Sequence, residues 1–164
     1  MINSAITKQI TLYGHQAPSA DNSQPWHFIW DGSLLLIKYD TPRVEGKTFP
    51  ANNPATLLSL GAAIENIYLI SNSYEIKCCH SVTFEDLSST HAKAIIDFQS
   101  TPQLALPDPL NNHPVVNRHT NRFAYHSKTL PKLAVNHLEK LTFSNCFQRI
   151  IIGNISKPQS DQAT

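Results

Sequence analysis

The chain has 164 residues, which is about the size of one domain. Its 13 basic and 12 acidic side chains give a formal net charge of +1, which excludes the strongly basic surface of a nucleic-acid-binding protein. The apolar runs are far shorter than the ~20 residues that span a bilayer, residues 1–11 show no secretory signal, and three cysteines do not make a disulfide framework, so we expect a cytoplasmic protein without a membrane partner.

The first part of the chain predicts a helix, a loop and a β-hairpin. Apolar residues at helical spacing predict a helix over residues 2–13, with Gly14 as its stop. A loop over residues 15–25 follows, which is rich in Pro, Ser, Asp and Asn and is called the polar loop below. Two β-rich runs, residues 26–30 and 34–39, then flank an Asp-Gly turn, and this pattern is typical of a hairpin.

A long helix is predicted over residues 54–72. Asn53-Pro54 combines a favourable N-cap residue with proline at the first helical position. The apolar residues that follow cover most of the helix circumference, so we expect the helix to be buried on several sides. Its Gly61-Ala62-Ala63 segment favours the close approach of another backbone. The residues expected in the core include Leu57, Ile64 and Tyr68.

The second half of the chain predicts shorter elements. Strands are expected over residues 75–84 and 92–98, and a proline-rich connector over residues 99–114. Thr129-Leu130-Pro131 begins another predicted helix. The remaining expected segments are a β-run over residues 147–152 and a disordered tail over residues 156–164.

These elements predict an α+β fold in which a mixed or antiparallel sheet packs on a central buried helix. The β-run over residues 147–152 is as apolar as a strand inside a sheet, yet no predicted element follows it. Either this run completes the earlier sheet, or the chain is the front part of a longer protein.

Several common catalytic patterns are missing from the sequence. The eight histidines have no metal-ligand spacing with cysteine or glutamate, so we expect no metal site. The sequence also has no glycine-rich phosphate loop and no G-x-S-x-G nucleophile motif.

The polar loop carries the side chains of greatest chemical interest. Ser19, Asn22 and Gln24 offer hydroxyl and amide groups on a backbone that Pro18 and Pro25 restrict. Such neutral donors and acceptors suit the edge of a planar heterocycle. The alternative is an ordinary turn, in which Ser19 or the nearby Asp21 caps local backbone groups.

The stretch Ala17–Phe28 resembles the signature APS-x-x-N-x-QPW-x-F of the FMN-dependent nitroreductase superfamily and matches it at every defined position. The segment Leu60–Leu69 resembles the helix of that family with the pattern GAA-x-x-N-hydrophobic. The resemblance implies a nitroreductase-like fold in which Trp26 and Phe28 hold a strand in the core. The residues that it implicates at the isoalloxazine ring of FMN are Pro18, Ser19, Asn22 and Gln24.

A second motif lies beyond the connector. Members of the superfamily usually open with an R-x-S-x-R segment that binds the FMN phosphate, but residues 1–16 contain no arginine. Arg118, Thr120 and Arg122 instead form an R-x-T-x-R motif, whose two guanidinium groups and hydroxyl suit a phosphate monoester. Alone, such a motif is more often a basic pair at a helix end. Beside the loop signature, the resemblance implies that these three residues bind the FMN phosphate.

The order of the two motifs resembles the two-repeat, Acg-like branch of the superfamily, which includes fused nitroreductase domains. This resemblance implies a first repeat over residues 1–105 and the start of a second, truncated repeat over residues 113–152. It also implies an oxidoreductase that uses FMN, NAD(P)H as electron donor, and a small-molecule acceptor such as a nitroaromatic compound or a quinone. The flavin site would be completed by a second repeat or by a homodimer.

The sequence nominates no catalytic acid or base. His27 and His119 lie near the two motifs, but histidines in such positions are more often structural. Two other functions therefore stay open: a flavin-binding protein that sequesters its ligand without turnover, and a structural module that binds no flavin.

Overall fold

The computed structural model describes residue 2 and residues 4–84, 91–99, 113–120, 123 and 129–137. The chain divides into two compact units, Met1–Asn121 and Arg122–Thr164. In the second unit, residues 132–137 are helical, which confirms a helix directly after Thr129-Leu130-Pro131. The predicted β-run over residues 147–152, the tail over residues 156–164 and most of the connector lie outside the described residues.

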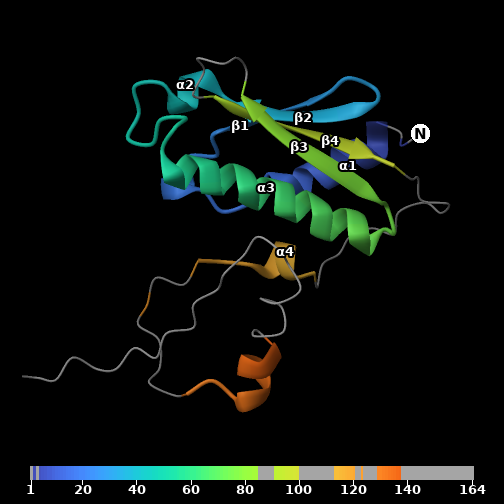
Figure 1. Cartoon of the computed structure of the whole chain (residues 1–164), viewed down its shortest axis with the longest axis vertical. Helices are drawn as coiled ribbons and strands as arrows, with labels where there is room; N and C mark the ends of the chain where they lie inside the picture. The colour runs from blue at the N-terminus through green and yellow to red at the C-terminus, as the bar shows by residue number, and fades with distance from the viewer. Residues whose placement is uncertain are drawn as a thin grey trace, which may run out of the picture. The chain divides into compact units, whose positions relative to one another are not determined.

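The first unit contains a four-stranded antiparallel sheet, which confirms the α+β class (Figure 1). The strand order is β1-β2-β4-β3. The hairpin strands and the fourth strand have the predicted bounds. The strands are β1 (Trp26–Trp30), β2 (Leu34–Tyr39), β3 (Cys78–Phe84) and β4 (Ala92–Phe98).

Strand β3 begins at Cys78, three residues later than the predicted start at residue 75. The reason is the way in which the preceding helix ends. Glu75 has the left-handed conformation with φ 57°, and the N–H of Ile76 donates to the carbonyl of Ser71 at 2.8 Å. This pattern is a Schellman-type cap, which takes up the residues that were expected to begin the strand.

The turn of the predicted hairpin is held by one carboxylate. Asp31 accepts hydrogen bonds from the backbone N–H groups of Leu34 at 2.7 Å and Ser33 at 2.8 Å, and from the Ser33 hydroxyl. These hydrogen bonds lower the pKa of Asp31, and the bond from Leu34 has the largest effect. Gly32 has φ 103°, a conformation that other residues rarely adopt, so the Asp-Gly pair fixes the register of β1 and β2.

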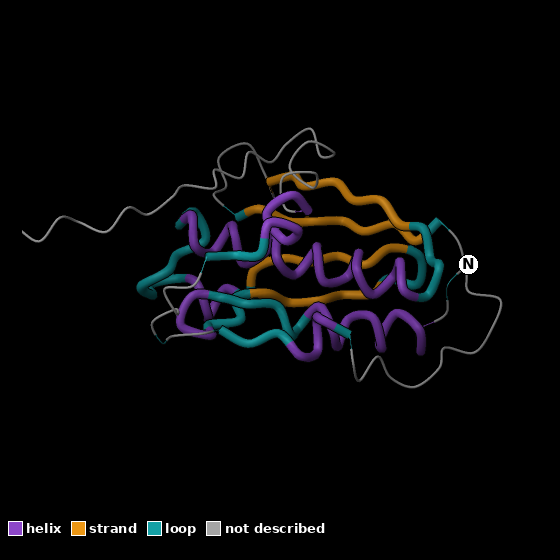
Figure 2. The backbone as a smooth tube through the Cα atoms, turned by 90° about the horizontal axis from the view of Figure 1, so that it is seen from below, coloured by secondary structure: helices purple, strands orange, loops and turns teal. Residues whose placement is uncertain are grey.

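Two long helices, α1 (Ser4–Gly14) and α3 (Pro54–Ser73), cover one face of the sheet (Figure 2). Asn53 caps α3 as predicted, because its side chain accepts from the N–H of Ala55 at 2.8 Å. The residues of β2 and β4 alternate in burial, so every second side chain faces the helices. In the described ranges, no helix has both the length and the apolar character that crossing a bilayer requires.

The expectation that α3 is buried on several sides was wrong, because one side of the helix is exposed. Ile64 is only 7% exposed, but Leu57 is 40% exposed and Leu58 is 74% exposed. Gly61 is exposed, and a Cβ added there would meet no atom within 4 Å. Within the described part of the chain, the sheet and α1 contact only part of the circumference of α3, and Leu57, Leu58 and Gly61 lie exposed on its other side.

The asparagine of the GAA-x-x-N pattern joins the two helices. Asn66 is buried, and its amide Nδ2 donates to the carbonyl oxygen of Tyr13, at the end of α1, at 3.0 Å. We expect Asn66→Ala to lower the free energy of unfolding by about 1–3 kcal/mol, because it removes a buried hydrogen bond and a packed side chain. Chemical denaturation measures this change. The matched control is Asn72→Ala on the same helix, because Asn72 is exposed; equal effects of the two substitutions would contradict the expected role.

Candidate functional site

The polar loop begins where α1 meets the core. Gly14 ends the helix in close contact with its neighbours, since a Cβ at this position would lie 3.2 Å from side-chain atoms of both Ile67 and Phe28. The hydrogen bond from Asn66 fixes the carbonyl of Tyr13, the residue before Gly14. The start of the loop is therefore held by α3 and β1. Glycine suits this position because a Cβ atom would press against side chains of both elements.

The centre of the polar loop has an unusual backbone. Asp21, Asn22 and Gln24 all have left-handed conformations, with φ of 49°, 55° and 44°. Asp and Asn tolerate this region, whereas glutamine seldom adopts it. Each such residue costs of order 1–3 kcal/mol, and clusters of them are typical of ligand-binding segments.

Ser19 stabilises this shape. Its Oγ accepts a hydrogen bond from the backbone N–H of Gln24 at 2.9 Å, across the bend of the loop. Ser19 therefore caps a local backbone group, which is the turn interpretation that the sequence left open. Asp21 does not share this role, because its carboxylate makes no hydrogen bond within the described part of the chain. One hydroxyl thus holds the two sides of the loop together.

The remaining loop residues differ in exposure. Pro18 and Asn22 are exposed at the surface, whereas Gln24 is half-buried. Trp26 is buried and Phe28 packs against the core, as expected for residues that anchor β1. The loop therefore offers Pro18 and Asn22 outward, while its last residues lead into the sheet.

Arg43 is a site residue that the sequence analysis missed. It lies on the short helix α2 (Thr41–Val44), and its guanidinium forms an ion pair with Asp40 at 3.1 Å. The same side chain donates to the carbonyls of Ser23 and Gln24, each at 3.3 Å. The sequence does signal the helix that carries Arg43, because Asp40 followed by Thr41-Pro42 is a typical helix start, but it does not signal the contacts of Arg43 with the loop carbonyls.

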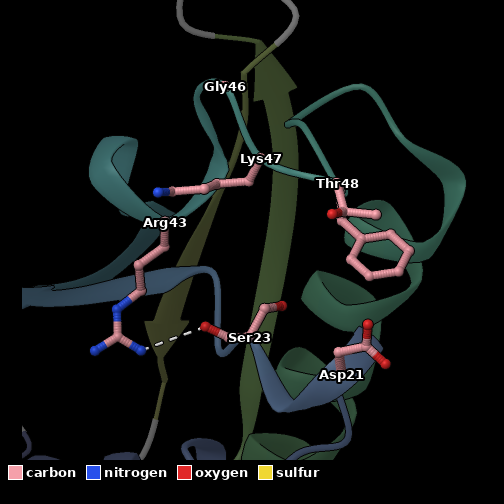
Figure 3. Close-up of a pocket in the computed structure, with 7 residues that line it drawn as sticks. Asp21, Ser23, Arg43, Gly46, Lys47 and Thr48 are labelled. Carbon is pink, nitrogen blue, oxygen red and sulfur yellow. Dashed lines mark hydrogen bonds between the residues drawn. The ribbon is translucent and has the colours of Figure 1, made fainter.

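Two cavities border the loop, and Arg43 lines both. One has a volume of about 330 Å³ and is called the His15 cavity here. Its lining residues are His15, Gln24, Trp26, His27, Phe28, Asp40 and Arg43. The other has a volume of about 350 Å³ and is called the Lys47 cavity. Its lining residues are Asp21, Ser23, Arg43, Gly46, Lys47, Thr48 and Phe49 (Figure 3).

The His15 cavity has mixed aromatic and polar walls. The rings of His15 and Phe28 lie 4.4 Å apart between centroids. Partial desolvation lowers the pKa of His15, and the charges of Arg43 and His27 lower it further. The indole N–H of Trp26 is buried without an acceptor among the described residues.

The first arginine of the R-x-T-x-R motif reaches the polar loop. Arg118 directly follows helix α4 (Pro114–Asn117), which Val115 anchors in the core. Its guanidinium donates to the carbonyl of Gln16 at 3.3 Å, between residues 102 positions apart. Thr120 is exposed, and Arg122 lies outside the described residues. The structure therefore brings one phosphate-binding candidate beside the loop and leaves the other two unassigned.

The histidines near the motifs show no catalytic geometry. His27 is exposed, and a ring nitrogen of His119 lies 3.3 Å from the carbonyl of Asn117. A third histidine, His113, lies 3.2 Å from the hydroxyl of Ser73. However, its Nδ1 accepts from the N–H of Val115, so its Nε2 carries the proton and donates to the serine. This pair lacks the free base that a serine nucleophile requires.

No family model matches the chain, and no curated protein matches it. The family resemblance therefore depends on the motif residues themselves. What the structure adds is the hydrogen bond from Arg118 to the carbonyl of Gln16, the residue that precedes the loop signature.

Proposed function

We propose that the chain is part of an FMN-dependent oxidoreductase of the nitroreductase type, which transfers electrons from NAD(P)H to an electrophilic small molecule such as a quinone or a nitroaromatic compound. One observation carries this proposal. The Arg118 guanidinium contacts the carbonyl of Gln16, so a group suited to phosphate lies beside a loop suited to a planar heterocycle. FMN joins these two chemical groups in one molecule.

The residues present fit such a ligand. Pro18, Asn22 and Arg118 are all exposed, so a ligand has access to each of them. The Arg118 side chain would bind the phosphate, with Thr120 and Arg122 as the further candidates from the same motif. Asn22 and Gln24 would meet the ring, and Ser19 would keep the loop in shape through its bond to the N–H of Gln24. Left-handed backbone at Asn22 and Gln24 is consistent with a segment shaped for binding.

When bound, FMN would accept hydride from NAD(P)H and pass the electrons to the acceptor. The role of the chain is to bind and orient the ligands. An amide N–H of Asn22 or Gln24 that faces the carbonyl edge of the ring would stabilise the negative charge of the reduced form. No described residue is assigned as a catalytic acid or base.

The exposed side of α3 supports a site with a second half. Leu57, Leu58, Leu69 and Gly61 leave an uncovered apolar and small-residue surface on the helix that carries Asn66. In the proposed two-repeat arrangement, residues 1–105 form the first repeat and residues 113–152 begin the second. A second repeat or a second copy of the chain would cover this surface.

Turnover separates the proposed enzyme from the two alternatives. The purified chain is loaded with FMN, and NADPH oxidation is measured with a quinone or a nitroaromatic acceptor. Acceptor-dependent oxidation supports the proposal. Bound FMN without oxidation of NADPH would indicate a flavin-sequestering protein, and a chain that binds no FMN would indicate a structural module.

Asn22 provides a test at the ring. We expect Asn22→Gly to lower the midpoint potential of bound flavin by about 20–60 mV, because the loss of one hydrogen bond to the reduced ring is worth about 1–3 kcal/mol in a two-electron couple. Glycine is the suitable replacement, since Asn22 has φ 55° and alanine would add backbone strain. Spectroelectrochemical titration measures the potential. Asn52→Gly, at another exposed loop asparagine, is the control; an identical potential in wild type and Asn22→Gly would remove Asn22 from the ring.

A further inference from the structure

The Lys47 cavity is lined by Asp21 and Ser23 of the polar loop and by none of the residues assigned to the flavin. Figure 3 shows the two cationic side chains, Arg43 and Lys47, on one side of the cavity and the carboxylate of Asp21 on the other. The hydroxyl groups of Ser23 and Thr48 also line it. The cavity is therefore polarised, with positive charge at one end and an acceptor of hydrogen bonds at the other.

The two cations differ in how firmly they are held. Arg43 is fixed by its ion pair with Asp40 and by its bonds to two loop carbonyls, so its planar group is already oriented. Lys47 is exposed, and within the described ranges its ammonium has neither an ion pair nor a hydrogen bond. Because Asp40 offsets part of the charge of Arg43, the Lys47 ammonium is the main group that the cavity offers to a phosphate, with the oriented guanidinium as a second donor.

The backbone on both sides places these groups. Asp21 has φ 49°, and Gly46, next to Lys47, has φ 62°. At Gly46 this conformation favours glycine, and a turn there leads the chain from α2 to Lys47 and Thr48. The Asp21 carboxylate is likewise unpaired within the described residues, so it is available to accept hydrogen bonds from a ligand.

We propose that the Lys47 cavity binds the adenosine 2′-phosphate portion of NADPH and so gives the enzyme a preference for NADPH over NADH. Arg43 and Lys47 bind the 2′-phosphate, and Asp21 accepts a hydrogen bond from the neighbouring ribose hydroxyl. Rossmann-type sites likewise use an arginine for the 2′-phosphate of NADP, whereas a carboxylate that binds the 2′-hydroxyl selects NAD, so Asp21 is assigned here to the 3′-hydroxyl. The ring of Phe49 in the cavity wall offers an apolar surface for the adenine. This inference rests on the proposed function, which supplies the reason for NADPH to bind.

The test uses 2′,5′-ADP and 5′-AMP, which differ in the 2′-phosphate, in calorimetric titrations of the full chain. We expect 2′,5′-ADP to bind about 10- to 100-fold more tightly, as one or two charge-assisted contacts provide. Lys47→Ala should remove most of this difference and leave 5′-AMP binding unchanged. Lys77→Ala removes an exposed lysine that does not line the cavity, and it should change neither affinity.

Equal affinities of the wild-type chain for the two nucleotides, or no binding of either, would overturn the proposed site. An unchanged preference in Lys47→Ala would also overturn it.

A separate FMN titration distinguishes this inference from the proposed function. If the chain binds FMN but Lys47→Ala leaves nucleotide preference intact, only the inference fails. If Lys47→Ala removes the 2′-phosphate preference of a chain that binds no FMN, the phosphate site stands and the proposed function fails. If Lys47→Ala weakens FMN instead, the cavity holds the flavin phosphate and the inference fails.

Discussion

Ile67→Asp is expected to lower the free energy of unfolding by roughly 3–5 kcal/mol, which is the usual cost of an uncompensated buried charge. Ile67 is 0% exposed on α3, and its side chain lies against Gly14 at the end of α1. An aspartate there would be shielded from water, and the described core around it is apolar and contains no lysine or arginine. Thermal or chemical denaturation followed by circular dichroism measures the change.

The control for this prediction is a substitution of the same chemistry on the same helix. Leu58 is 74% exposed, so in a chain that gel filtration shows to be monomeric Leu58→Asp leaves its charge in water and should change stability by less than about 0.5 kcal/mol. Similar destabilisation by the two substitutions would show that α3 is not packed as described.

Arg118→Ala is expected to weaken FMN binding by about 1.5–3 kcal/mol, because it removes a charge-assisted contact to the phosphate. We expect Arg122→Ala to have an effect of the same size, as the second arginine of the motif. Quenching of FMN fluorescence on binding gives the dissociation constants. Arg118→Lys is informative as well, since it retains the charge but loses the planar group, and it should restore only part of the affinity.

A control must separate the loss of the Arg118 contact from the loss of one positive charge. Lys8 is an exposed cation on α1 and lines neither cavity, so Lys8→Ala is the matched control and should leave FMN binding unchanged. If FMN binds equally well to the wild type and to Arg118→Ala, the arginine motif plays no part in the site.

Local signals predicted much of the fold. The hairpin follows from Asp31, whose carboxylate holds its own turn, and the start of α3 follows from the Asn53 side chain and the proline after it. In both cases the responsible groups lie within a few residues of one another. Their effect is therefore readable from adjacent positions in the sequence.

Long-range packing was less predictable. The exposure of Leu57 and Leu58 depends on how much of α3 the sheet and α1 cover, which the apolar pattern of one helix does not contain. The contact between Arg118 and Gln16 likewise depends on the docking of α4 through Val115. Motif resemblance suggested that the two segments act together, but their spacing along the chain gave no physical reason for contact.

The polar loop shows why residue type alone left two interpretations open. The Ser19 hydroxyl was suited either to a ligand or to a local cap, and it makes the local bond. Arg43 was overlooked because it bonds to backbone carbonyls of the loop, and every residue type has such a carbonyl, so the sequence does not mark the partner. The functional reading of the loop therefore depends on the residues that remain outward, above all Asn22 and Pro18.

The most direct test of the proposed function is the reduction of protein-bound flavin by NADPH. The chain is mixed with FMN, separated from free FMN by gel filtration, and titrated with NADPH in the absence of oxygen while its visible absorbance is recorded. We expect the protein to elute with a flavin band, the band to bleach as NADPH is added, and a quinone to restore it. A protein that elutes colourless, or whose flavin band is unchanged by NADPH, would contradict the proposed oxidoreductase.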